Sequence, residues 1–105
     1  MPSRAAPPDE SPMYNLTGFQ RDLLFVLDGM DGPSGKEVRQ AIERSQDRKV
    51  RHARLYANLN ELVEEGLVSK GREDGRTNEY DTTAAGHRLL RDRYEWEEQY
   101  LQAVG

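Results

Sequence analysis

Residues 55–72, with the sequence LYANLNELVEEGLVSKGR, decide the fold of this chain. Four aliphatic side chains in this stretch recur at helical spacing, namely Leu55, Leu59, Leu62 and Val63. They predict one buried stripe on a helix over about 50–65. Gly66 follows directly, and glycine is typical of the left-handed residue just past a helix end. The alternating residues 67–72 then predict a short strand, so a helix passes almost directly into a strand.

A hairpin and a last helix follow this stretch. Residues 73–75, Glu-Asp-Gly, have turn composition, and residues 76–81 predict the return strand. Thr82 or Thr83 is expected to cap a long final helix over 83–104.

Two further helices are predicted before the helix over about 50–65. The first is expected from Leu16 to Met30, with an apolar stripe but also a run, residues 23–27, that is apolar nearly all round. A Gly- and Pro-containing turn leads to Ser34, an N-cap with Glu37 in the capping-box position of a helix ending near Ser45. Residues 1–12 contain four prolines and are expected to be disordered, which leaves one domain over 13–105.

The predicted order is helix, helix, helix, hairpin and long helix, a mainly α fold with a small β-hairpin (α+β). It resembles a winged helix-turn-helix with a long C-terminal dimerisation helix. The residues that carry the resemblance are Leu55-Tyr56, Leu59, Leu62, Glu64-Glu65-Gly66-Leu67-Val68, Tyr80 and Thr83-Ala84-Ala85-Gly86. This ordered set is similar to that of the PadR family of transcriptional regulators.

Two departures from the PadR pattern are visible. Ala53-Arg54 stands where the family usually has a small residue and Thr before the Leu-Tyr pair, and the first wing strand is short. Small acidic members like this chain resemble haloarchaeal regulators of the family, including one tied to the oxidative-stress response. The resemblance thus implies a halophilic host and a stress-response role.

The charge distribution contains a local basic patch on an acidic protein. Lys and Arg number 15 against 19 Asp and Glu, a net charge of −4, which argues against a general polyanion binder. Residues 48–76 nevertheless hold seven basic and five acidic residues, a net charge of +2, and no acid lies between Arg48 and Asn60.

The second helix of a helix-turn-helix enters the major groove, which makes this patch the candidate DNA-binding site. Opposite the buried stripe, the helix is predicted to present Ala53, Tyr56, Ala57 and Asn60. Arg54 suits guanine and Asn60 suits adenine, whereas basic residues at the helix start suit phosphates. The predicted DNA-binding residues are Lys36, Arg48, Lys49, Arg51, His52, Arg54, Tyr56, Asn60, Arg72 and Arg76. The alternative is that they are solvated charges, with the wing turn neutralised by its own Glu73 and Asp74.

The first and last helices carry more apolar surface than a domain of this size can cover, which favours a homodimer. The predicted dimerisation residues are Leu24, Phe25, Leu90, Tyr94, Trp96, Tyr100 and Leu101. The alternative is that the aromatic residues line a drug pocket, as in some relatives.

Several classes of function have no support. The chain contains no Cys, which rules out disulfides and thiolate chemistry. His52 and His87 have no spaced carboxylate for a metal site, and no nucleophile–base or phosphate-loop pattern marks an enzyme, so we expect no cofactor. No apolar run is long enough to span a membrane and no signal peptide is visible, so a soluble cytoplasmic protein is expected.

The expected partners are double-stranded DNA with an inverted-repeat operator and a second copy of the chain. Glu61, Glu73 and Asp74 are expected to recruit cations that bridge them to phosphates. The rival function is a protein-interaction module on the same scaffold without DNA binding, which the acidic charge favours, and an RNA-binding winged helix is a weaker option.

Overall fold

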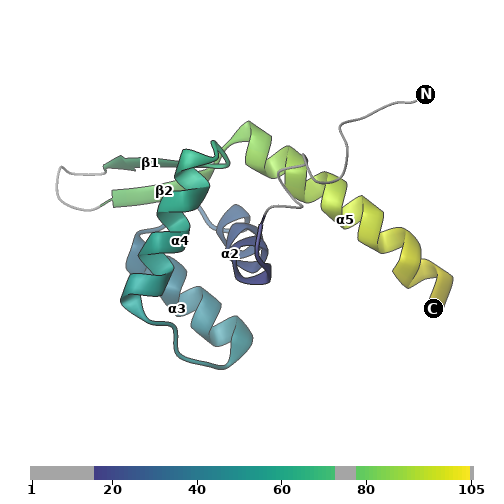
Figure 1. Cartoon of the computed structure of the whole chain (residues 1–105), viewed down its shortest axis with the longest axis horizontal. Helices are drawn as coiled ribbons and strands as arrows, with labels where there is room; N and C mark the ends of the chain where they lie inside the picture. Colours follow the sequence, from purple (N-terminus) through teal and green to yellow (C-terminus); the bar gives the residue numbers. More distant parts are fainter. Residues whose placement is uncertain (1–15, 73–77, 105) are drawn as a thin grey trace.

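The structure, a computed structural model, describes residues 16–72 and 78–104, without the side chains of Arg72 and of residues 102–104. Its elements are α2 (Gly18–Asp28), α3 (Gly35–Gln46), α4 (His52–Glu64), β1 (Val68–Arg72), β2 (Asn78–Thr82) and α5 (Ala84–Val104) (Figure 1). They confirm the predicted order and the α+β class. The predicted disordered segment 1–12 and the turn between the strands lie outside the described residues.

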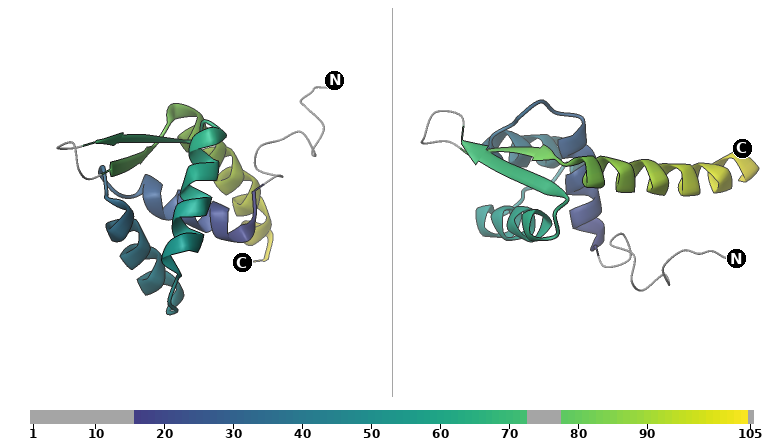
Figure 2. Two further views of the ribbon diagram at one scale, coloured as in Figure 1. Left: turned by 60° about the vertical axis from the view of Figure 1, so that its left-hand side comes forward. Right: turned by 90° about the horizontal axis from the view of Figure 1, so that it is seen from above.

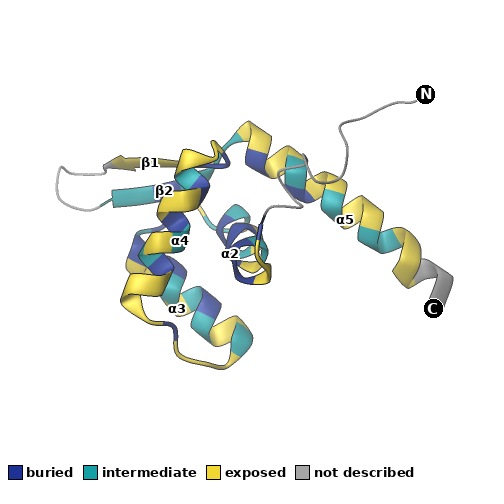
Figure 3. Ribbon diagram, in the orientation of Figure 1, coloured by how far each residue is buried: buried dark blue, intermediate teal, exposed yellow. Residues whose placement is uncertain are grey.

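One hydrophobic core joins all six elements. The side chains buried at its centre are Leu23, Leu24, Leu27, Val38, Ile42, Leu55, Leu59 and Leu62. Leu67, Val68 and Tyr80 cover it from the hairpin, and Leu90 covers it from α5. The helices therefore turn their buried faces toward one another, while the outer face of α4 is largely exposed (Figure 3).

Capping boxes fix the starts of the first two helices. The predicted box at α3 is present, because Ser34 Oγ accepts from the Glu37 amide at 3.2 Å and Glu37 Oε1 accepts from the Ser34 amide at 2.8 Å. A second box, not predicted, starts α2 with Thr17 and Gln20. It shortens α2 relative to the predicted span, since Leu16 lies outside the helix and Gly29 ends it.

The hairpin is held against the turn before α3. Its strands are antiparallel, with Lys70 opposite Tyr80. The Tyr80 amide donates to Pro33 O at 2.9 Å, and Ser34 forms a bridge with Glu79. The wing base is therefore tied to the first helix of the helix-turn-helix. The return strand is described from Asn78 to Thr82 and ends one residue later than predicted, whereas its predicted start at residues 76 and 77 lies outside the described residues.

The start of α5 is packed directly on the end of α4. Gly66 has φ of 77°, as predicted for the residue after that helix. The Thr83 amide donates to Leu67 O at 3.0 Å, and Thr83 Oγ1 donates to Gly66 O at 2.7 Å and accepts from the Gly86 amide at 3.0 Å. Thr83 therefore caps α5, and Gly86 is needed because a Cβ there would overlap the carbonyl oxygen of Leu67.

The second half of α5 projects from the domain (Figure 2). Exposed apolar side chains lie along it, with Tyr94, Trp96, Tyr100 and Leu101 all about half exposed or more. Two of the predicted dimerisation residues are buried within the single chain instead of lying on its surface. Leu24 is fully buried and Leu90 is 3% exposed, because α2, α5 and the hairpin cover them within the chain, so neither offers a surface to a partner. Phe25 is exposed in the single chain, and its role in a dimer stays a prediction.

Among the described residues, no helix combines the length and apolar character that crossing a membrane requires.

A polar cluster links α2, β2 and the first turns of α5. Asp28 Oδ2 lies 2.9 Å from His87 Nδ1, and Thr82 Oγ1 donates to Asp28 Oδ1. Partial burial raises the pKa of the Asp28 carboxyl, but the hydrogen bonds from Thr82 and His87 and the His87 charge outweigh it and lower that pKa below 3.8.

This lowered pKa predicts how stability depends on pH. The ionised Asp28 stabilises the fold fully above about pH 3.8, and this contribution is lost as pH falls through the lower folded-state pKa. Urea unfolding of the Asp28→Asn variant should therefore show a deficit in unfolding free energy at neutral pH that shrinks on acidification below that value. Asp92→Asn, at an exposed site on α5, should show no such trend. A deficit that stays constant down to pH 2 would contradict the assignment.

Candidate nucleic-acid interface

The connector from 47 to 51 sets the angle between α3 and α4. Asp47 adopts a left-handed conformation, with φ of 52°, which ends α3 and turns the chain. Val50 is buried, and its amide donates to Glu43 Oε2 at 2.7 Å. The connector is thus attached to α3 by a hydrophobic side chain and a charge-assisted hydrogen bond. The α3–connector–α4 unit and the adjoining hairpin form a winged helix-turn-helix.

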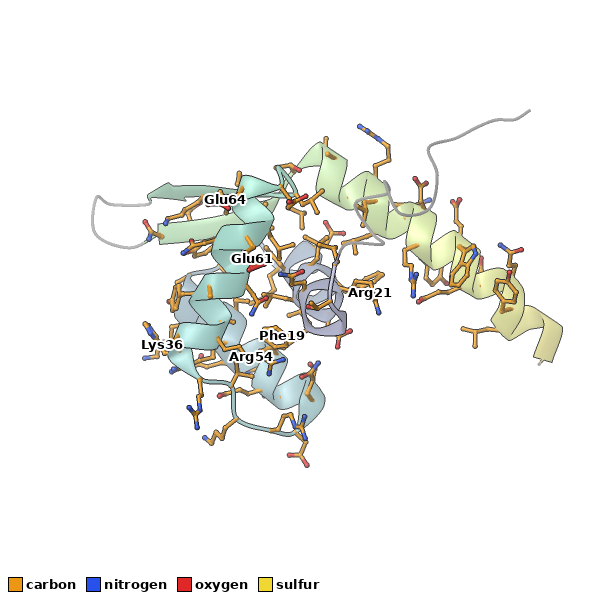
Figure 4. All side chains as sticks on the ribbon, in the orientation of Figure 1. Phe19, Arg21, Lys36, Arg54, Glu61 and Glu64 are labelled. Carbon is orange, nitrogen blue, oxygen red and sulfur yellow. The ribbon has the colours of Figure 1, made fainter. Side chains whose placement is uncertain are left out.

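The outer face of α4 lies opposite its buried leucines. It consists of Ala53, Ala57, Asn60 and Glu64, all of which are exposed. Charge changes sign along the helix, because Arg51 and Arg54 lie at its start, whereas Glu61 and Glu64 lie in its second half (Figure 4). The N-terminal half of α4 is therefore the half suited to phosphate and base edges.

The side of α4 that faces α3 carries Tyr56 and His52. Tyr56 was predicted on the exposed face, but it is half-buried and packs against the core. Its hydroxyl group occupies the space in which a side chain on Gly35 would lie, and its ring centroid is 4.4 Å from that of His52. The reason is that helical residue 56 lies a quarter turn from Leu55, toward the first turn of α3. Its role as a DNA contact stays a prediction.

The other side of α4 faces the first turn of α2. The Arg54 guanidinium carbon lies 4.0 Å from the centroid of the Phe19 ring (Figure 4). Gln20, which is 5% exposed, donates to Asn58 Oδ1 at 3.0 Å and to Glu61 Oε1 at 2.8 Å. Phe19, Gln20 and Asn58 are not among the residues that the sequence predicted for the site. Only the capping-box spacing of Thr17 and Gln20 marks this turn in the sequence.

Most of the predicted phosphate-binding residues are exposed. Lys36 lies on the first turn of α3, Arg48 and Lys49 lie in the connector, and Arg51 is the N-cap of α4. Arg44, which was not predicted, lines a shallow hollow together with Arg48 and Lys49. These cations therefore lie on α3, in the connector and at the start of α4.

The wing residues are not placed. The side chain of Arg72 is not described, and Arg76 lies outside the described residues together with Glu73 and Asp74. In the described ranges no three His, Cys, Asp or Glu side chains gather in a way that could hold a metal ion.

The winged helix-turn-helix defines the class of protein, and similarity to a known family defines the family. The model of the transcriptional regulator PadR-like family matches residues 23–92. The chain therefore belongs to the PadR-like family of transcriptional regulators, as its sequence motifs predicted.

Solved structures of similar proteins have the same fold as this chain. The structure of H. salinarum RosR grown from NaBr is 40% identical, with a TM-score of 0.76 over 82% of this chain and 77% of that chain. The complex structure of hsRosR-SG is 39% identical, with a TM-score of 0.80 over 86% of this chain and 80% of that chain. Streptococcus pneumoniae FabT in complex with DNA is 13% identical, with a TM-score of 0.73 over 91% and 64% of the two chains, and shares the fold. No curated protein sequence matches the chain.

Proposed function

We propose that this regulator is a homodimer that binds an inverted-repeat operator, with the N-terminal half of α4 in the major groove of each half-site. The observation that carries this proposal is the outer face of α4. Its first half is free of acids and carries two small alanines, which allow close approach to the bases. The cations of the connector and of α3 border the same half and suit the flanking phosphates.

The experiment that tests DNA binding is a mobility-shift titration with fragments of the host genome. A sequence-selective shift is expected, and its footprint should contain two half-sites spaced by about one helical turn of DNA. Absence of any selective shift at every salt concentration would support the rival function, an interaction module without DNA binding.

The homodimer is proposed from the apolar side chains that α5 leaves uncovered. Tyr94 and Leu101 extend the stripe that begins at the buried Leu90. Phe25 of α2 lines a groove together with Leu90 and Tyr94. Trp96 and Tyr100 pack edge to face on an adjacent strip, with ring centroids 5.1 Å apart. A second copy of α5 would remove both strips from water, and a two-fold dimer reads an inverted repeat.

Replacing Arg54 with alanine tests the proposed base contact. The variant should lose about 1–3 kcal/mol of binding free energy on the operator and should relax base preference at one position of each half-site. Lys49→Ala is the matched control, because loss of a phosphate contact should weaken binding to all sequences alike. Titrations against a panel of single-base operator variants measure both effects. Identical profiles for the two variants would contradict these roles.

We also propose that the regulator works in a salty cytoplasm, which its similarity to H. salinarum RosR supports. An ordinary binder with 6–10 phosphate contacts loses roughly 10³–10⁵ in affinity between 50 and 200 mM salt. The acids around this interface repel DNA at low salt and are proposed to take up bridging cations. The slope of log affinity against log salt concentration should therefore be shallow or positive. A stress-response role, which the resemblance implies, would need a sensor other than cysteine.

Measuring operator affinity from low to molar salt tests this proposal. Replacing Glu61, Glu73 and Asp74 with Gln or Asn should steepen the loss of affinity with salt. Asp92→Asn, which removes an acid on α5, should leave the slope unchanged. A steep loss of wild-type binding between 0.05 and 0.2 M salt would overturn the proposal and leave DNA binding itself intact.

A further inference from the structure

The first turn of α2 contacts α4 through two neighbouring side chains. Phe19 lies under the guanidinium of Arg54, with 4.0 Å from the guanidinium carbon to the ring centroid. Gln20 donates to both Asn58 and Glu61, one and two helical turns further along α4. Two residues of α2 thus contact α4 at Arg54, Asn58 and Glu61.

Both polar atoms of the Gln20 side chain are hydrogen-bonded in this position. Its amide nitrogen donates to Asn58 Oδ1 and Glu61 Oε1, and its Oε1 accepts from the Thr17 amide at 3.1 Å. The Asn58 amide nitrogen in turn donates to the carbonyl oxygen of Arg54 at 2.8 Å. A buried amide with every partner satisfied prefers one geometry, since any rotation of α4 would leave polar groups unpaired. Gln20 therefore fixes how α4 is turned about its own axis.

Phe19 contacts the side chain of Arg54, whereas Gln20 acts on the orientation of α4 as a whole. The Phe19 residue is only 9% exposed, whereas Arg54 is exposed. The ring is therefore held by the core, and its face attracts a cation that would otherwise sample many rotamers in water. Arg54 is the residue to which the proposed function assigns a base contact. A planar guanidinium that binds guanine through two hydrogen bonds must be presented in one plane, and contact with a fixed ring restricts where the guanidinium lies.

We propose that Phe19 is a positioning residue for DNA reading, which orients the Arg54 guanidinium while Gln20 fixes the rotation of α4. This inference rests on the proposed function. It assigns part of the base specificity to α2, a helix outside the helix-turn-helix. Phe19 itself need not contact DNA.

The test compares base discrimination among variants of the full-length protein. Phe19→Leu keeps an apolar side chain but removes the aromatic face. It should reduce discrimination by about 2- to 5-fold at the base pair that Arg54→Ala identifies, and not at other positions, as expected for a cation–π contact of about 0.5–1 kcal/mol. Phe19→Tyr should restore discrimination. The double variant Phe19→Leu/Arg54→Ala should discriminate no less than Arg54→Ala alone, because both changes remove the same contact.

Controls separate positioning from a general loss of stability. Leu27→Val removes buried volume from the same helix without touching Arg54, and should leave base discrimination at wild-type values. If Phe19→Leu does not fold, Phe19→Met repeats the test with a longer and more adaptable apolar side chain.

The outcomes distinguish this inference from the proposed function. If Arg54→Ala relaxes base preference but the Phe19 variants that fold do not, the positioning role is overturned and the base contact stands. An equal loss with Leu27→Val overturns it as well. If Arg54→Ala changes no base preference, the base contact and the positioning role fall together.

Discussion

Replacing Gly86 with alanine is expected to destabilise the fold by about 3 kcal/mol, the upper part of the range for overpacking. The direction is opposite to the usual effect, because alanine in a helix is normally about 1 kcal/mol more favourable than glycine. In this chain a Cβ at position 86 would overlap the backbone carbonyl oxygen of Leu67. Backbone cannot move aside as a flexible side chain can. Relief would require α5 to shift away from the Gly66–Leu67 turn and to weaken the hydrogen bonds of Thr83.

Denaturant unfolding at fixed protein concentration measures this effect, and Gly18→Ala is the control. Gly18 also lies in the first turn of a helix, but the nearest atom to its added Cβ would be the end of the Arg21 side chain at 3.9 Å. That variant should be neutral or slightly stabilising. The close packing of α5 on Leu67 would be disproved if Gly86→Ala matched Gly18→Ala in stability.

The second large effect is expected from a charge on the exposed apolar stripe of α5. Tyr94→Glu should convert the proposed dimer to monomer and weaken operator binding about 100-fold or more. The physical reason is that linking two half-site contacts raises overall affinity by roughly 10²–10⁴. A carboxylate on this stripe would have to be buried without a partner in the dimer. Trp96→Ala should weaken the dimer in the same direction, since it removes the largest side chain from the second strip.

Sedimentation at micromolar concentration and operator titration measure the two consequences together. Gln99→Glu is the matched control, because it adds the same charge on the side of α5 opposite Tyr94 and should leave both unchanged. Helix content should be retained in all three variants, as Tyr94 is 55% exposed in the single chain. Wild-type protein that sediments as a monomer would contradict the dimer.

Local order was predictable because it depends on neighbours in the sequence. The spacing of Leu55, Leu59 and Leu62 predicted the buried stripe of α4, and all three are fully buried. Ser34 with Glu37 predicted the start of α3, and Gly66 predicted the left-handed end after α4. In each case the pattern lies within about two helical turns of the chain, so a single sequence contains it.

The sequence did not determine which side of each apolar helix meets which neighbour. The run 23–27 is apolar nearly all round, and so its pattern could not separate Leu24, buried within the chain, from Phe25, exposed beside α5. Leu90 and Tyr94 share one helical stripe, yet only Leu90 is covered, because α5 leaves the domain between them. Periodicity defines the direction of a side chain but not the length over which a partner covers it.

Tertiary structure alone decided how the side chains that we propose to read DNA are held. Tyr56 packs beside Gly35, Arg54 lies on Phe19, and Gln20 bonds to Asn58 and Glu61, which are 38 and 41 residues away in the chain. The sequence by itself determined the elements, their order and the basic start of α4. The orientation of that helix depends on packing between α2, α3 and α4, and such contacts form only when segments far apart in the chain meet in one core.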